Sequence, residues 1–183
     1  MSAHLIPHAQ DQGIALTTAA TAFGMMSALN IAGVVLATLL ADTCTRKNIL
    51  ATVYALRGLG YLILLVAPAP WSLWGFATLV GFSWIATLPL NTSLTADFYG
   101  LKYLGTLTGI THLFHQIGSA ASILLAGVLR DLTGSYDLPF AIAGCLLLPA
   151  TLVSFSIQEK QYAAKYQALP ASAGGPGGPL TAG

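Results

Sequence analysis

Five long apolar stretches constrain this chain more than any other feature of its sequence. Each has the roughly 17–25 predominantly apolar residues that a helix needs to cross a bilayer. None alternates polar and apolar residues as a membrane barrel does, and an open strand in lipid would leave backbone groups unpaired. The sequence therefore predicts an all-α fold, a polytopic membrane helix bundle with about five transmembrane helices, at residues 14–40, 49–66, 71–90, 104–129 and 138–157.

The charge content points to the same surroundings. Charged residues make up 7% of the 183 residues and hydrophobic residues 55%, whereas soluble domains carry about 25% charged residues. So few charges cannot cover a water-facing surface, so we expect a lipid bilayer around the chain. A net charge of +1 excludes the strongly basic surface with which proteins bind nucleic acid.

The distribution of basic residues predicts the orientation. One side of the predicted bundle carries Arg46, Lys47, Lys102, Lys160 and Lys165, and the other carries Arg130. Because cytoplasmic loops hold an excess of Lys and Arg, we expect a multi-pass protein of the cell inner (plasma) membrane. Its N-terminus would lie outside and its C-terminus in the cytoplasm. The Gly- and Pro-rich residues 158–183 are predicted to form a disordered cytoplasmic tail.

Arg57 lies near the middle of the second stretch. A charge at that depth costs about 2.5–3.5 kcal/mol on insertion scales and marks a candidate functional site. Arg57 could hold an anionic substrate group or pair with a carboxylate. The alternative is a structural arginine whose side chain extends to the cytoplasmic face.

Further polar residues lie within the predicted spans. His112, His115 and Gln116 fall on one face of the fourth, and Asn30 lies in the first. Histidine changes protonation near neutral pH, so these residues are candidates for binding substrate or protons. The alternative is a set of hydrogen bonds between helices. We expect no metal site, because His112-x-x-His115 lacks a second pair of ligands, and neither a catalytic set nor a cofactor is indicated.

Small residues spaced four apart predict close helix packing. Ala20, Gly24 and Ala28 share a face of the first span. Such faces let the backbones of membrane helices approach each other.

Two segments between spans resemble the major facilitator superfamily (MFS). Residues 33–47 resemble its loop motif of a glycine followed by Leu-Ala-Asp-Arg and a basic pair, with Asp42, Arg46 and Lys47 at the charged positions and Thr43 where arginine is usual. Residues 126–137 resemble the Gly-x-x-x-Asp-x-Thr-Gly-Ser-Tyr segment before the last span. The overall character is closest to the oxalate/formate and monocarboxylate porter branch.

The resemblance implies a partial MFS fold, with the five predicted spans matching the eighth to twelfth of twelve. It implies that the first, third and fourth spans line a cavity and that the second and fifth are peripheral, which favours the histidines over Arg57. It implies that Asp42, Arg46 and Lys47 act at a cytoplasmic gate. A missing N-terminal half would be the partner, because such sites form between two halves.

Three functions follow as hypotheses. The first is transport of a small solute, with an organic anion as one candidate, by an alternating-access permease of which this chain is a C-terminal part. The second is a non-transporting membrane scaffold or a subunit of a larger membrane complex. The third is a small membrane enzyme that uses His112 and His115.

Overall fold

The structure is a computed structural model that describes residues 2–66 and 70–158. Of the predicted tail, residues 159–183 lie outside the described residues. The described residues contain no strand, which confirms the predicted all-α fold. The helices are η1 (Ser2–His4), α1 (Leu5–Asp11), α2 (Leu16–Ala41), α3 (Arg46–Val66), α4 (Trp71–Ser83), α5 (Thr87–Tyr99), α6 (Leu104–Thr133) and α7 (Asp137–Ser156).

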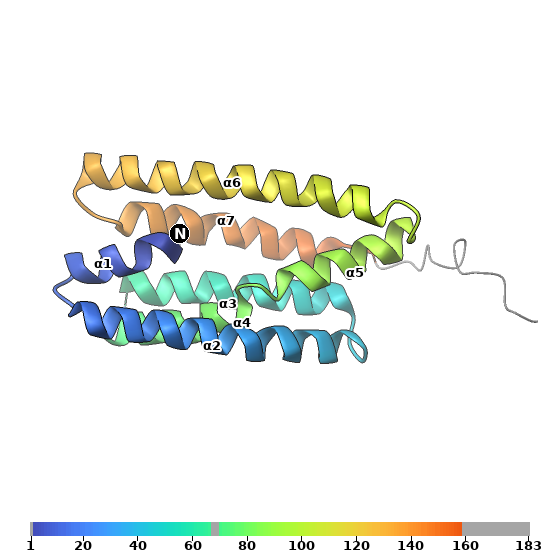
Figure 1. The fold of residues 1–183 in the computed structure, drawn as a ribbon, viewed down its shortest axis with the longest axis horizontal. Helices are drawn as coiled ribbons and strands as arrows, with labels where there is room; N and C mark the ends of the chain where they lie inside the picture. The colour runs from blue at the N-terminus through green and yellow to red at the C-terminus, as the bar shows by residue number, and fades with distance from the viewer. Residues whose placement is uncertain (1, 67–69, 159–183) are drawn as a thin grey trace, which may run out of the picture.

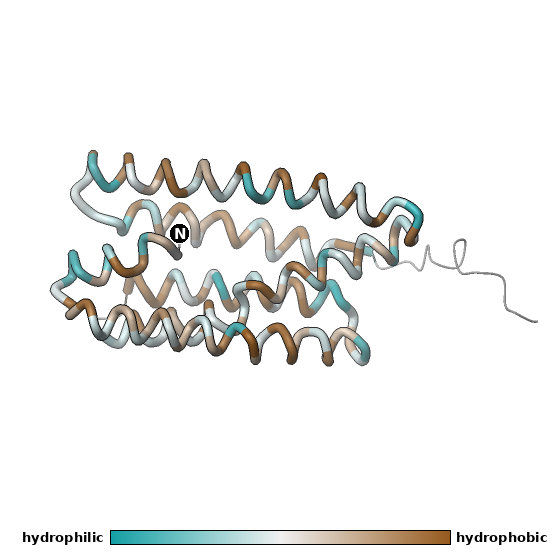
Figure 2. Tube along the Cα trace, viewed as in Figure 1, coloured by the Kyte–Doolittle hydropathy of each residue, from teal (hydrophilic) through white to brown (hydrophobic). Residues whose placement is uncertain are grey.

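The long helices run side by side along one axis (Figure 1). Five segments are long and apolar enough to cross a membrane, with α4 and α5 together forming the third of them. Figure 2 shows hydrophilic residues at the two ends of the bundle and again in the middle of α6. The described residues thus form a bundle of long apolar helices.

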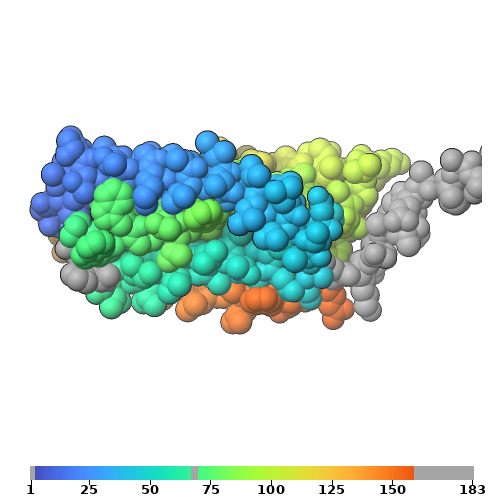
Figure 3. Space-filling model, turned by 90° about the horizontal axis from the view of Figure 1, so that it is seen from below, coloured from blue at the N-terminus to red at the C-terminus, as the bar shows by residue number. Residues whose placement is uncertain are grey.

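α3 lies at the centre of the packing. It makes extensive contacts with α4 and α7, and α2 packs along α4. Seen from below, α2, α3 and α4 form one closely packed face (Figure 3). This packing buries an apolar cluster that includes Met26, Tyr61, Phe76 and Phe140.

Two glycines allow α2 and α4 to approach closely. A Cβ atom on Gly33 would overlap the backbone of Phe82, and one on Gly81 would lie 2.9 Å from the Met26 carbonyl oxygen. The predicted small face of α2 is not the one used, because Ala20, Gly24 and Ala28 are exposed. Small residues alone could not identify this contact face, because apolar residues lie all around α2, and a packing role for the predicted face stays a prediction.

The third apolar stretch is not one continuous helix. α4 ends at Ser83, residues 84–86 form turns, and α5 begins at Thr87 and continues to Tyr99. Pro89 explains the break, since proline lacks the N–H that would bond to the Ile85 carbonyl and its ring clashes with that group. Leu88 N donates to the Ile85 oxygen instead, at 2.9 Å.

α6 lies at the edge of the bundle. It contacts α5 and α7 over short lengths, and Ala126 is its one buried residue. At one end of the bundle, Arg130 of α6 forms an ion pair with Asp11, the last residue of α1, at 3.2 Å. At the same end, His4 Nε2 lies 3.1 Å from the Ile123 carbonyl oxygen.

Candidate functional site: a cavity beside a broken helix

The break between α4 and α5 exposes backbone groups in the middle of an apolar segment. Asn30 of α2 accepts a hydrogen bond from Ile85 N through Oδ1, at 3.0 Å. Arg57 of α3 donates from Nη2 to the carbonyl oxygens of Ser83 and Trp84, the latter at 2.6 Å. Two residues predicted from sequence as site candidates therefore meet at one structural feature, which they help to stabilise.

The guanidinium of Arg57 keeps unused donors. Its Nε is buried without a hydrogen-bond partner, and Nη1 has no hydrogen bond to any described residue. The guanidinium carbon lies 5.9 Å from the centre of the Tyr54 ring. No carboxylate in the described part of the chain forms an ion pair with Arg57. A half-buried positive charge with free donors can bind an anion.

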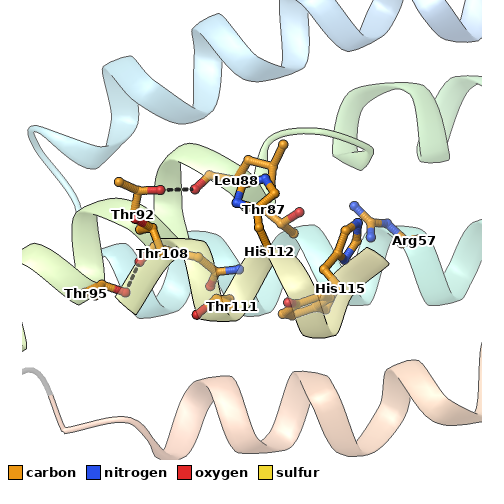
Figure 4. Close-up of a pocket in the computed structure, with 11 residues that line it drawn as sticks. Arg57, Thr87, Leu88, Thr92, Thr95, Thr108, Thr111, His112 and His115 are labelled. Carbon is orange, nitrogen blue, oxygen red and sulfur yellow. Dashed lines mark hydrogen bonds between the residues drawn. The ribbon is translucent and has the colours of Figure 1, made fainter. Parts of the chain in front are cut away.

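Threonines surround a small cavity next to Arg57. It has a volume of about 140 Å³ and lies between α3, α5 and α6. Figure 4 shows Arg57 and His115 at the same end of it. The Thr92 and Thr95 hydroxyls donate within α5, to Leu88 and Asn91. We call it the threonine cavity; it is lined by Tyr54, Arg57, Thr87, Leu88, Asn91, Thr92, Thr95, Thr108, Thr111, His112 and His115.

A second, larger cavity also reaches Arg57. Its volume is about 510 Å³, and it lies between α6 and the helices α2, α3, α4 and α7. Apolar side chains such as Met26, Phe76 and Leu147 form one wall of it, and α6 contributes His115, Gly118, Ser119 and Ser122; we call it the apolar chamber after the first wall. Arg57 and His115 line both cavities. The two residues therefore lie where the two cavities meet.

The structure brings some of the predicted residues together and leaves others apart. His112 joins His115 in the threonine cavity. Gln116 is exposed on α6 and lines neither cavity, and Asn30 supports the helix break without lining either. In the described residues, no group of three or more His, Cys, Asp or Glu could hold a metal ion.

Sequence reasoning missed the threonines and one acidic residue. Thr108 and Thr111 share the face of His112 and His115 at helical spacing, and that pattern could have identified them. Asp97 near the end of α5 pairs with Arg46 at the start of α3. This partner lies 51 positions away in sequence, so no local pattern could reveal it.

The other two predicted gate residues lie at the same end of the bundle. Asp42 is exposed and follows the last residue of α2. Lys47 Nζ lies 3.5 Å from the carbonyl oxygen of Phe155 in α7. Basic side chains thus link the start of α3 to the ends of α5 and α7.

Comparison with known proteins agrees with this architecture. The sequence model described as Major Facilitator Superfamily matches residues 2–173. Monocarboxylate transporter 12-B of Danio rerio is 26% identical over 90% of this chain and 35% of its own length. The uncharacterized MFS-type transporter YcxA of Bacillus subtilis (strain 168) is 29% identical over 78% of this chain and 36% of its own length.

The human monocarboxylate transporter 11 is 29% identical over 82% of this chain and 34% of its own length. The chain thus spans about a third of the length of these relatives. No solved structure shows a significant match. The family match covers nearly all of the sequence, and five helices are suited to crossing a membrane. The chain is therefore a multi-pass membrane protein that belongs to the Major Facilitator Superfamily.

Proposed function

We propose that this chain is the C-terminal part of an alternating-access permease that moves small organic anions, with Arg57 holding the anionic group. The observation that supports the proposal is the unused hydrogen-bonding capacity of Arg57 between two cavities. A charge inside a membrane protein is retained where it has a role in a cavity or a pathway. A carboxylate accepts charge-assisted hydrogen bonds, so Nη1 can donate to one while Nη2 stays bonded to the helix break.

The relatives support the same choice of substrate. Two of those named above carry the name monocarboxylate transporter. A non-transporting scaffold would not require a guanidinium with free donors beside a cavity. A membrane enzyme would need a set of reactive groups, and the relatives named above are transporters.

A second half of the permease would complete the site. In this family the substrate site lies between two halves that move relative to each other. α6 is exposed along nearly its whole length and carries the polar face of the threonine cavity. We propose that an N-terminal half covers α6 and closes both cavities. We also propose that the five apolar segments cross the inner membrane, with the N-terminus outside and the C-terminus in the cytoplasm.

Two sets of side chains would control the transport cycle. Arg46 and Asp97 join α3 to the end of α5, so their separation would let these ends move apart at the cytoplasmic gate. Asp42 and Lys47 lie at the same end of the bundle. His115, and His112 beside it, line the threonine cavity with Arg57 and are the proposed proton-binding groups near the bound anion.

The second half would close the site, but Arg57 and both cavities lie within this chain, so binding to the purified chain in lipid nanodiscs tests the proposal. We expect [14C]propionate to bind the wild type, and Arg57→Gln to weaken binding about 10-fold or more, because a hydrogen bond to a charged group contributes about 1.5–3 kcal/mol. Arg57→Lys keeps the charge but loses the planar donor set that bonds the helix break and the anion at once, so it should bind with intermediate affinity. Arg130→Gln is the control, since Arg130 lines neither cavity. Equal binding by wild type and Arg57→Gln would refute the role of Arg57.

A further inference from the structure

We infer that the preferred substrate is a monocarboxylate with an apolar tail about the size of an aromatic ring, and that this tail occupies the apolar chamber. The inference rests on the proposed function, because it takes Arg57 as the group that holds the carboxylate. The inference adds the apolar tail, which is the part of the substrate that would determine specificity.

The position of Arg57 relates the two parts of such a ligand. The guanidinium lines both cavities: threonines dominate the smaller one, and apolar side chains of α2, α4 and α7 form one wall of the larger one. A carboxylate at Arg57 therefore has two directions in which the rest of the molecule can extend. An apolar tail gains most from the apolar wall of the chamber, where closure by the second half would remove it from water.

The volumes of the two cavities lead to the same choice. The threonine cavity holds about 140 Å³, which suits a carboxylate with a few atoms or waters. The apolar chamber holds about 510 Å³. A cavity of about 150 Å³ is sufficient for benzene in a protein interior. The chamber therefore has room for a ring and its linker, whereas a two-carbon tail would leave most of it unfilled.

The lining of the chamber is suited to a flat apolar group. Phe76, Met26 and Trp84 are among its lining residues, and the Trp84 ring packs edge-on to Phe23, with the two ring centres 6.1 Å apart. Aromatic rings prefer edge-to-face and offset contacts with one another. An aromatic tail would add one more member to this group.

Small residues of α6 create the space. The α6 wall of the chamber is made by His115, Gly118, Ser119 and Ser122. A Cβ atom on Gly118 would meet no other atom within 4 Å. A larger side chain at Gly118 would therefore extend into the chamber without displacing the backbone.

Two acids that share a carboxylate group but differ in the tail distinguish the contribution of the tail to binding from that of the charge. The purified full chain in nanodiscs is titrated with [14C]propionate and with [14C]3-phenylpropionate. Burial of a phenyl ring should make 3-phenylpropionate bind about tenfold tighter or more. Equal affinities for the two acids, each still dependent on Arg57, would overturn the inference and leave the proposed function intact.

A pair of glycine variants locates the tail. Gly118→Leu should reduce the preference for 3-phenylpropionate to about threefold or less, because leucine occupies the space for the ring, and should leave propionate affinity nearly unchanged. Gly109→Leu is the matched control: it lies on α6, has open space around it and lines neither cavity. A preference that survives Gly118→Leu, or that Gly109→Leu reduces equally, would overturn the inference. Binding of both acids that does not depend on Arg57 would refute the proposed function itself.

Discussion

Asn30 of α2 and Arg57 of α3 both form hydrogen bonds with the backbone where the helix is interrupted between α4 and α5. Each uses its side chain to bond backbone groups at the break between α4 and α5. The hydrocarbon core of a bilayer contains no water that could bond these groups instead. The sequence identified both as polar residues inside predicted spans. It could not identify their partners, because the partners are backbone groups that become available only where the helix breaks.

The family resemblance and the structure give Arg57 different weight as a site candidate. The resemblance placed its helix at the periphery and lowered its standing as a site candidate. In the structure, α3 is central to the packing of the chain and Arg57 lines both cavities. The role of Arg57 stays a prediction, which rests on the depth of the charge in the apolar stretch and on its place between the two cavities.

Asn30→Ala should destabilise the protein, because Ile85 N would lose its acceptor in an apolar region. Hydrogen bonds of this kind in membrane proteins contribute about 0.6–1.7 kcal/mol. Ser27→Ala is the matched control, since Ser27 lies on the same helix and its hydroxyl donates to Phe23 of its own helix, at 3.0 Å. Thermal unfolding of the detergent-purified variants measures the difference. A similar Tm for both variants would show that the Asn30 bond contributes little.

The helices differ in how well the sequence predicted them. All five apolar stretches are helical, because length and hydrophobicity suffice to predict a membrane helix. The break after Ser83 was not predicted, although Pro89 lies within the third stretch and proline interrupts the backbone bonds of a helix. Prolines do not break every such helix, since Pro149 lies inside α7. Local sequence therefore indicates where a break can occur, and packing decides whether it does.

At the level of helix pairs, Gly33→Ala should weaken the packing of α2 on α4. An added methyl group would overlap the backbone of Phe82, which cannot move as a side chain can. We expect a loss of about 1–3 kcal/mol in the free energy of unfolding, seen as a lower Tm in detergent. Gly24→Ala on the same helix is the control, because its Cβ meets no other atom within 4 Å. That variant should be neutral or slightly stabilising, since alanine favours helix more than glycine. Equal effects would argue against the close approach at Gly33.

The whole molecule combines a tightly packed part with an exposed part. α2, α3, α4 and α7 bury one another, whereas α6 buries a single residue. The number of apolar helices was predictable from the sequence, because hydrophobicity is a local property. The arrangement that places Arg57 opposite His115 was not, since α6 is held there by its contacts with α5 and α7, which are distant in sequence from Arg57. An N-terminal half that covers α6 would make the exposed part an interface between two moving bodies, as alternating access requires.

The proposed orientation can be tested at the two ends of α2. Cys44 is exposed just after this helix, and Ala15 is exposed just before it. A helix of 26 residues separates them by about 39 Å at 1.5 Å per residue, more than the roughly 30 Å of hydrocarbon in a bilayer. In a Cys145→Ala background, a membrane-impermeant maleimide should label Cys44 only after the cells are permeabilised, because the basic end faces the cytoplasm. Ala15→Cys, made with Cys44→Ala, should be labelled in intact cells. The reverse pattern would invert the orientation, and labelling of both positions in intact cells would mean that α2 does not cross the membrane.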